Sequence, residues 1–423
     1  MIKIFKTKIY QIYESLTIFA VLIVSAHLQF ADQNKHISTW ERRYGNVEKA
    51  EFAWDIVETD EGNFVICGIT IGKNLLNING WIVKINNQGD VIWTKELGGE
   101  GQDFLTCVIQ NSDKELVFTG TKNQPPFGKQ VWFLILDKNG NLLKEKAIGG
   151  KEEDNGHRII QNKDGSYMIL GDTKSFGTQR GGKDVLLLNL DSKGEVLWRR
   201  AYDLGGQDMG TDIIPFQNNK YLITAVSCTA NCGGLFQQGF STYILIDSEG
   251  NILKTKIFKE GKKNKFIHLV STADGGAIIV GATSKKERFP SEDVWVVKLD
   301  KEVEMEWERT FGSYGRYDGG LGIFQSPDGG YYLCAYSQSL QTKQMDYDNW
   351  WLLKLDSKGN LLWSKWWGGP LNDDPYAIIP TSDGGLIMAG WRDANSNPFY
   401  KLSLGNADFY VIKTDANGEL NGK

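Results

Sequence analysis

His157 is the residue best suited to proton transfer in this sequence. The chain contains only 4 histidines, and His157 follows Asp154 by three residues. An imidazole beside a carboxylate can act as a general base with an orienting partner, although such a pair is also common as a purely structural hydrogen bond. Arg316 and Tyr317, or Arg392, could complete a His/Tyr/Arg set of the kind a lyase uses. His157, Asp154, Arg316 and Tyr317 are therefore candidate catalytic residues, but no sequence motif assigns them a reaction.

A second set of possible chemical groups consists of acidic residues that follow a Gly-Gly step or its equivalent. The set comprises Glu51, Asp103, Asp154, Asp208, Asp318, Asp373 and Asp374. The acids could form a ring that holds a cation, or they could cap turns by accepting hydrogen bonds from backbone amides. We favour capping, because a residue found in most repeats usually builds the repeat. No unit clusters oxygen ligands as a calcium loop does, so we predict no metal site and no cofactor.

Aromatic residues next to cations occur in long, irregular segments that we expect to be loops. They are Trp391, Arg392, Phe399, Tyr400, Phe289 and Arg288. Such pairs suit sugar rings or protein hot spots, although they could instead fold the loops back onto the scaffold. We predict them as ligand-binding residues for a glycan or a protein partner.

The cysteines fall into two groups. Cys67, Cys107 and Cys334 lie in apolar stretches and are expected to be buried. Cys228 and Cys232 share a Gly-rich segment without a second Cys or His pair, which argues against zinc. We predict a local disulfide between them, given an oxidising compartment.

The N-terminus indicates export. Lys3, Lys6 and Lys8 precede an apolar run from Leu16 to Ala26 that is short for a membrane span. We predict a signal peptide at 1–26 and a linker at 27–36, with a secreted or periplasmic mature chain that does not insert in a membrane. An uncleaved anchor is the alternative. The net charge of −5 and absence of a basic domain argue against a nucleic-acid partner.

Internal repetition identifies the elements that must position these residues. A marker Trp, or Lys in two units, recurs at 40, 93, 144, 198, 254, 307 and 363. Spacings near 50 residues with strand and turn signals predict a seven-bladed β-propeller over 37–423. The units are about 40–92, 93–143, 144–197, 198–253, 254–306, 307–362 and 363–423.

Each unit contains four strand patterns, and the first has a paired apolar step such as Ile159-Ile160, as expected of a strand buried on both faces. The last unit stops where its fourth strand should begin, whereas Ile37 to Arg42 forms an unpaired strand before the first unit. We therefore predict that the N-terminal strand completes the last blade and removes an exposed sheet edge.

The pattern Asp-x-x-Gly-x-x-x-Trp followed by Gly-Gly, as at Asp191 to Trp198 and Gly205-Gly206, resembles the repeat of secreted bacterial seven-bladed propellers. It is also similar to the tryptophan-docking repeat of the quinoprotein-like superfamily. That second resemblance implies eight blades and a quinone held over calcium, but the count of seven and the absence of a matching cofactor site argue against a quinone-dependent dehydrogenase.

The sequence thus favours an exported, non-catalytic binding or scaffolding propeller. It would recognise a glycan or protein through the face that carries the long loops between the second and third strands of each blade. The alternative is a polysaccharide-active lyase or glycosidase with its site at the channel mouth. Fold alone does not choose between them, and the oligomeric state is not predicted.

Overall fold

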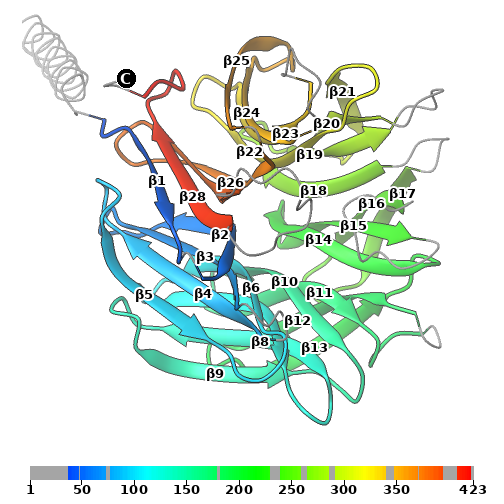
Figure 1. The fold of residues 1–423 in the computed structure, drawn as a ribbon. Helices are drawn as coiled ribbons and strands as arrows, with labels where there is room; N and C mark the ends of the chain where they lie inside the picture. Colours follow the sequence, from blue (N-terminus) through cyan, green and yellow to red (C-terminus); the bar gives the residue numbers. More distant parts are fainter. Residues whose placement is uncertain are drawn as a thin grey trace, which may run out of the picture. The chain divides into compact units, whose positions relative to one another are not determined.

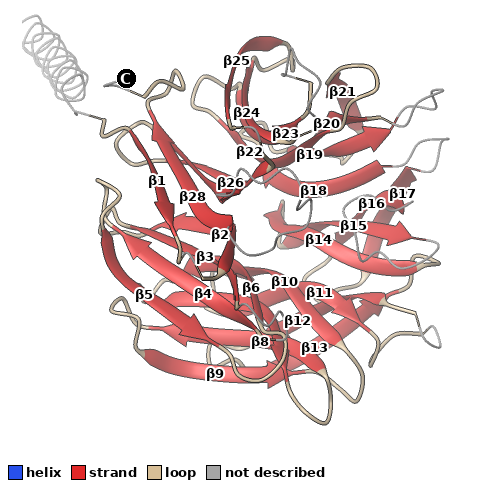
Figure 2. Ribbon diagram, viewed as in Figure 1, coloured by secondary structure: helices blue, strands red, loops and turns tan. Residues whose placement is uncertain are grey.

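A computed structural model describes residues 37–46, 48–72, 77–178, 182–228, 239–258, 264–284, 291–339, 347–369, 371–393 and 407–420. Residues 39–423 form one compact unit. Its described part is built from seven four-stranded antiparallel sheets arranged as the blades of a ring, which confirms the seven-bladed propeller (Figure 1). All the regular elements described are strands (Figure 2). Within these residues, no helix has the length and apolar character needed to cross a bilayer.

Each blade is a simple meander from an inner to an outer strand. The first blade consists of β2 (Ala50–Glu58), β3 (Phe64–Ile71), β4 (Ile78–Ile85) and β5 (Val91–Leu97), and the second of β6 (Phe104–Gln110), β7 (Leu116–Asn123), β8 (Lys129–Leu136) and β9 (Leu142–Ile148). The third consists of β10 (Asp154–Gln161), β11 (Tyr167–Thr173), β12 (Asp184–Leu190) and β13 (Val196–Tyr202), and the fourth of β14 (Gln207–Phe216), β15 (Lys220–Cys228), β16 (Gly239–Ile246) and β17 (Ile252–Phe258). The last three are β18 (Asn264–Ser271), β19 (Ala277–Ser284), β20 (Glu292–Leu299), β21 (Met305–Phe311); β22 (Asp318–Gln325), β23 (Tyr331–Ser337), β24 (Asn349–Leu355), β25 (Leu361–Trp367); and β26 (Asp373–Pro380), β27 (Leu386–Asp393), β28 (Ala407–Thr414) with β1 (Trp40–Tyr44).

The last blade is closed by the N-terminal strand, as predicted. β1 pairs antiparallel with β28, in a register that runs from Trp40 opposite Lys413 to Tyr44 opposite Phe409. The strand begins three residues later than Ile37 and continues to Tyr44, because both of its aromatic ends are buried. The Tyr44 hydroxyl also donates a 2.7 Å hydrogen bond to the Gly89 carbonyl of the first blade. The closing strand therefore joins the last blade to the first.

The marker residues link neighbouring blades. The Trp93 Nε1 donates a 3.2 Å hydrogen bond to the Lys138 carbonyl in a turn of the next blade. In the fourth blade, the Lys254 ammonium replaces the indole and donates to the Glu302 carbonyl at 2.9 Å. The outer strand continues past the marker residue, since β5 runs on from Trp93 to Leu97 with its outer face exposed.

The turns before the outer strands follow the expected Asp-x-x-Gly chemistry. The Asp137 carboxylate accepts 2.8 Å hydrogen bonds from the amides of Asn139 and Asn141, and Gly140 supplies the positive φ of 82° that the turn requires. These turns and the marker residues form a repetitive frame, which holds the inner strands in place.

Candidate functional site

The innermost strand of every blade carries a β-bulge at the same position. In β10, for example, Gly156 pairs with Gly171 and Arg158 pairs with Leu170, so His157 is the extra residue. A bulge re-aims the side chain of its extra residue. The seven extra residues all line one cavity of about 630 Å³ at the centre of the ring; they are Trp54, Thr106, His157, Thr211, Ile267, Leu321 and Tyr376. We call this set the bulge ring and the space the central cavity.

The second strand of the blade accommodates the bulge with a small residue. A Cβ added to Gly120 would lie 1.9 Å from the Phe104 carbonyl oxygen, and one added to Gly171 would lie 1.8 Å from that of Asn155. Such contacts are impossible for a side chain, so glycine lets the bulged strand approach. The repeat therefore fixes the bulge position, while the residue that the bulge presents varies from blade to blade.

The cavity opens among the starts of the first and third strands and the ends of the second strands, which is the face carrying the loops between strands two and three. Its wall is aromatic over the first two blades and the last one, through Trp54, Phe104 and Tyr376. The Trp54 and Phe104 rings meet edge to face, with centroids 6.0 Å apart. Ile267 and Leu321 extend the apolar wall.

The wall at the third blade is formed instead by polar and charged side chains. His157 Nε2 lies 2.7 Å from Asp172 Oδ2, and Lys183 Nζ lies 2.8 Å from Asp172 Oδ1. The Asn155 amide donates to the same Oδ1 at 2.8 Å. Burial alone would raise the pKa of Asp172, but the hydrogen bonds and charges of His157 and Lys183 hold it well below its usual range. The carboxylate is thus ionised and orients the imidazole.

Lys129 projects from the start of β8 into the same corner of the cavity. Its ammonium lies 5.2 Å from the centre of the Phe104 ring, and it forms no ion pair with any described residue. Burial lowers the pKa of Lys129; Lys183 lowers it further, and Glu153 acts in the opposite direction. A half-buried cation without a carboxylate partner is a place where an anionic group of a ligand would be stabilised.

The floor of the cavity is a charged network contributed by four blades. The Arg158 guanidinium lies 3.0 Å from Asp212 Oδ1 and 3.4 Å from Asp55 Oδ2. Burial alone would lower the pKa of Arg158, but Asp212 and Asp55 raise it well above its usual value. His268 Nδ1 accepts a 3.3 Å hydrogen bond from the Ile323 amide, and burial lowers the pKa of His268, so this imidazole is neutral. The Arg158 charge is therefore paired with two carboxylates beside the cavity.

The expected pairing of His157 with Asp154 is wrong. Asp154 instead accepts a 2.7 Å hydrogen bond from the Gly150 amide and a short one from the Thr173 hydroxyl, because the β10–β11 register places Thr173 opposite it and Asp172 nearer the ring axis. The capping interpretation of the repeated acids is confirmed for all of them except Asp374, whose Oδ1 is buried and has no hydrogen-bond partner among the described residues. Amides that donate to these acids include those of Gly99 to Asp103, Leu204 to Asp208, Ser313 to Asp318, Gly369 to Asp373 and Asn46 to Glu51.

Arg316 and Tyr317 do not line the central cavity. The Arg316 carbonyl accepts a hydrogen bond from the Glu292 amide, and the Tyr317 ring packs against a core cluster of the sixth and seventh blades. The cavity brings His157 together with Arg158 and Tyr376 instead. The predicted set of His157 with Tyr317 and Arg316 or Arg392 is therefore not brought together at the cavity.

The predicted ligand-binding residues fall into two groups. Trp391 and Arg392 lie on β27 rather than in a loop: the indole packs against Phe52 at 5.1 Å, and the guanidinium lies 3.5 Å from Asp373 and stacks over Tyr410. Both are half-buried in contacts between elements of the scaffold, as the alternative interpretation of these aromatics held. Phe399, Tyr400, Phe289 and Arg288 lie outside the described residues.

Among the cysteines, Cys67, Cys107 and Cys334 are free and buried, as predicted. Cys228 is disulfide-bonded and lines the central cavity. Cys232 lies outside the described residues, and so do the predicted signal peptide at 1–26 and the linker at 27–36.

Sequence reasoning missed Asp172, Lys183 and Lys129. Asp172 follows the position where the second strand holds its small residue, and the other blades have Ile69, Thr121, Val226, Ala282, Tyr336 and Trp391 there. Asp172 is the one charged residue at these seven positions. His157 was identified because it departs from the repeat, and the same criterion would have identified Asp172. Lys129 and Lys183 start or precede third strands of irregular sequence and carry no comparable signal.

No family model and no curated protein matches the chain. Among solved structures, a catalytically inactive virginiamycin B lyase from Staphylococcus aureus is 11% identical with a TM-score of 0.51, and the match covers 88% of this chain and 99% of that one. Sqt1 from Chaetomium thermophilum is 11% identical with a TM-score of 0.49, covering 92% and 99%. A protein of unknown function from Bacteroides caccae is 14% identical with a TM-score of 0.42, covering 77% and 94%. At such identities the similarity to the lyase shows the propeller fold and no more.

Proposed function

We propose that this protein is an exported binding propeller whose central cavity holds a negatively charged ligand of the glycan class. The observation that carries the proposal is Lys129, which is half-buried in the cavity beside an aromatic ring and without a carboxylate partner among the described residues. An acidic sugar would supply the missing anion, and its charge-assisted hydrogen bond would be strengthened by the partial burial.

The rest of the cavity suits the apolar part of such a ligand. Trp54, Phe104 and Tyr376 offer aromatic surfaces on which the C–H faces of a sugar ring can pack. The volume of about 630 Å³ falls within the range of small-ligand sites, which is roughly 300–1,000 Å³. His157 and Lys183, both held by Asp172, present polar groups at fixed positions. A preorganised polar corner beside an aromatic wall favours binding without a large change in shape.

A lyase remains the second candidate, and the His157–Asp172 pair favours it. A lyase would need a base that removes a proton next to a carboxylate and cations that stabilise the resulting negative charge. His157 could be that base, and Lys129 or Lys183 could hold the carboxylate. The solved lyase among the structural neighbours is similar only in fold.

The test uses oligosaccharides of uronic acids and their neutral methyl esters, with affinity measured by calorimetry. We expect the acid form to bind more tightly. Lys129→Met keeps the length of the side chain and removes its charge, and it should weaken binding of the acid by about 10- to 100-fold with little effect on the ester. The control is Lys163→Met on the exposed turn between β10 and β11, at the opposite ends of these strands.

Equal affinity of the wild type for acid and ester, or an acid affinity that Lys129→Met leaves unchanged, would contradict the proposal. The same samples decide between binding and catalysis. A lyase would generate an unsaturated uronate that absorbs in the ultraviolet, and His157→Ala would abolish that signal. A binding protein gives no such product, and we expect none.

A further inference from the structure

Two polar side chains meet at most of the junctions between consecutive blades. One is the first or second residue of a third strand, and the other is the repeated acid at or near the start of the first strand of the next blade. A glycine between them leaves room: a Cβ on Gly98 would lie 2.4 Å from Asn79 Oδ1 and 2.8 Å from Asp103 Oδ2. At a later junction, a Cβ on Gly312 would lie 2.4 Å from Asp293 Oδ1. Any side chain at this glycine position would therefore be directed at the polar pair.

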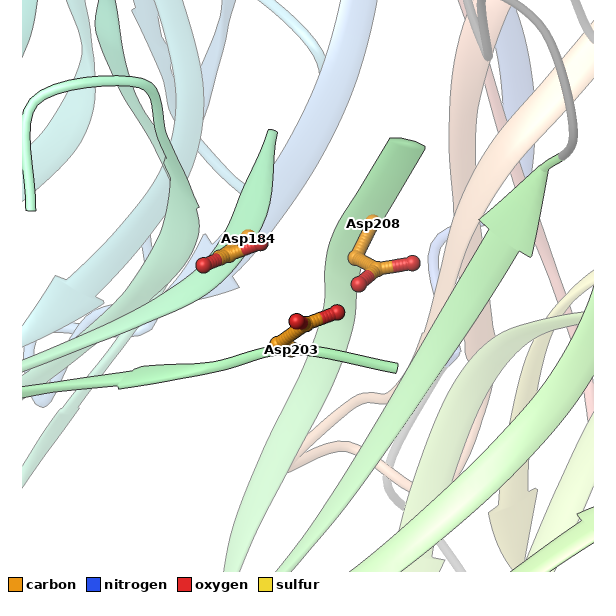
Figure 3. A group of neighbouring side chains, drawn as sticks. All are labelled: Asp184, Asp203 and Asp208. Carbon is orange, nitrogen blue, oxygen red and sulfur yellow. The ribbon is translucent and has the colours of Figure 1, made fainter. Parts of the chain in front are cut away.

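The junction between the third and fourth blades departs from this pattern. Its polar pair is Asp184, at the start of β12, and Asp208, in β14. Asp203 precedes Asp208 by five residues, just as Gly98 precedes Asp103, so an aspartate stands where most other junctions have glycine. The three carboxylates converge between β12, β14 and the segment that follows β13 (Figure 3). One oxygen from each lies within 4.8 Å of the others.

In each of the two buried aspartates, one carboxylate oxygen accepts a backbone hydrogen bond and the other does not. Asp184 Oδ2 accepts a 2.7 Å hydrogen bond from the Thr178 amide, and Asp208 Oδ2 accepts one of 2.6 Å from the Leu204 amide. By distance and angle, the buried Oδ1 atoms of both residues have no hydrogen-bond partner among the described residues, although the Ser227 hydroxyl opposite Asp208 lowers the pKa of that carboxyl. Both side chains are 0% exposed. Buried, unsatisfied carboxylate oxygens are costly unless a cation binds them.

Asp203 completes the cluster from the solvent side. Its Oδ1 accepts a 2.8 Å hydrogen bond from the Gly205 amide, and its Oδ2 accepts one of 2.9 Å from the Thr178 hydroxyl. Asp203 is exposed, whereas Asp184 and Asp208 are buried. A cation could therefore enter from solvent and keep some water ligands on that side, as hard cations commonly do.

We propose that Asp184, Asp203 and Asp208 form a binding site for a divalent cation, and that this cation is Ca²⁺. The cluster offers only carboxylate oxygens, which suit a hard cation, and no histidine or cysteine that would favour zinc. Three carboxylates of mixed burial allow the irregular, high-coordination geometry that Ca²⁺ tolerates better than Mg²⁺. The sequence predicted no metal here because Asp184 lies 24 residues from Asp208 and no calcium-loop motif joins them.

The site would stabilise one wall of the central cavity. Lys183 and Gln207 line that cavity and directly precede Asp184 and Asp208. A cation bridging β12 to β14 would link the third blade to the fourth at the level of these two side chains. The inference is independent of the ligand proposed for the cavity, because it depends only on the junction.

The test is calcium binding to the mature chain after dialysis against a chelator. We expect calorimetry to detect a Ca²⁺ site and the melting temperature to rise with added Ca²⁺. Asp203→Gly introduces the residue found at most of the other junctions, so it should fold, and it should weaken Ca²⁺ binding at least about tenfold. Asp293→Asn changes a junction with only two carboxylates and should leave the response unchanged.

Three results would overturn the proposal. The first is a wild-type protein whose heat signal and melting temperature do not respond to Ca²⁺. The second is a response that Asp203→Gly retains in full. The third is a response to Mg²⁺ but not Ca²⁺, which would contradict the assignment of the ion.

Discussion

The bulge ring and the frame of turns and marker residues are built from the same repeat, but they differ in which feature stays the same from blade to blade. In the frame, Trp93 and Lys254 differ in type and still make the same kind of contact with the next blade. In the bulge ring, the backbone position is the same in all seven blades, whereas the side chains range from Trp54 to Thr106 to His157. A repeat protein can thus keep its backbone geometry constant while the residues that face its cavity vary from blade to blade.

The largest expected effect on the frame comes from removing the closing strand. Deleting residues up to Tyr44 would expose the edge of β28 and remove the buried aromatic rings of Trp40 and Tyr44. We expect a loss above the roughly 3–5 kcal/mol typical of one buried aromatic truncation. Thermal unfolding would measure it, with a chain beginning at residue 37 as the control. An unchanged melting temperature would show that the ring does not depend on β1.

The charged floor should be the next most sensitive region. Arg158→Met would leave Asp55 and Asp212 without their shared cation, and uncompensated buried charge typically costs about 3–5 kcal/mol. Urea unfolding would measure the change. Arg199→Met, on the outer strand β13, is the matched control and should cost less than about 1 kcal/mol. Equal costs for the two variants would refute the role given to the floor.

Because the pKa of Asp172 is lowered by folding, we expect the stability of the protein to depend on pH in the acid range. The stabilisation from the ionised carboxylate is fully present above the unfolded pKa of about 3.9 and is lost as pH falls below that value. Asp172→Asn should lower stability at pH 7 by about 1–3 kcal/mol and flatten this part of the acid profile. Melting curves from pH 7 to about pH 3 test it. Asp113→Asn, on an exposed turn, should leave the profile as in the wild type; an Asp172→Asn profile that still falls in parallel with the wild type would disprove the assignment.

The smallest effect is expected within the frame. Trp93→Lys introduces the residue found at the same position in two other blades, where Lys144 and Lys254 donate to carbonyls of the next blade. We expect a cost below about 1 kcal/mol, whereas Trp93→Ala, which cannot make that contact, should cost more. Chemical denaturation of both variants gives the comparison. A Lys variant as unstable as the Ala variant would mean that the two residues are not equivalent.

Much of the fold could be predicted because the repeat expresses local rules seven times. Asp137 and Gly140 specify a turn through their own chemistry, and the paired apolar residues such as Ile159-Ile160 mark an inner strand. The site was predicted less well because its contacts depend on register. The bulge at His157 places Asp172 beside it, and the same register turns Asp154 into a cap.

Composition misled the prediction at the last blade. An aromatic residue beside a cation suggested a ligand-binding loop at Trp391 and Arg392. Arg392 instead occupies the position at which other blades have a hydroxyl residue that donates to the repeated acid, such as Thr173 or Ser337. At this position Arg392 forms an ion pair with the repeated acid Asp373. This equivalence becomes visible only when the strand pairing is known.

The proposed function requires that residues of the bulge ring contribute to ligand binding and can be exchanged without loss of the fold. It is tested most directly by measuring melting temperature and affinity for the acidic oligosaccharide on Trp54→Thr, which gives the first blade the bulge residue of the second and fourth. Trp366→Thr, an exposed site on the outer strand β25, is the matched control. We expect Trp54→Thr to lose at least about tenfold in affinity while its melting temperature stays close to that of the wild type. Unchanged affinity in Trp54→Thr, with a folded protein, would contradict the claim.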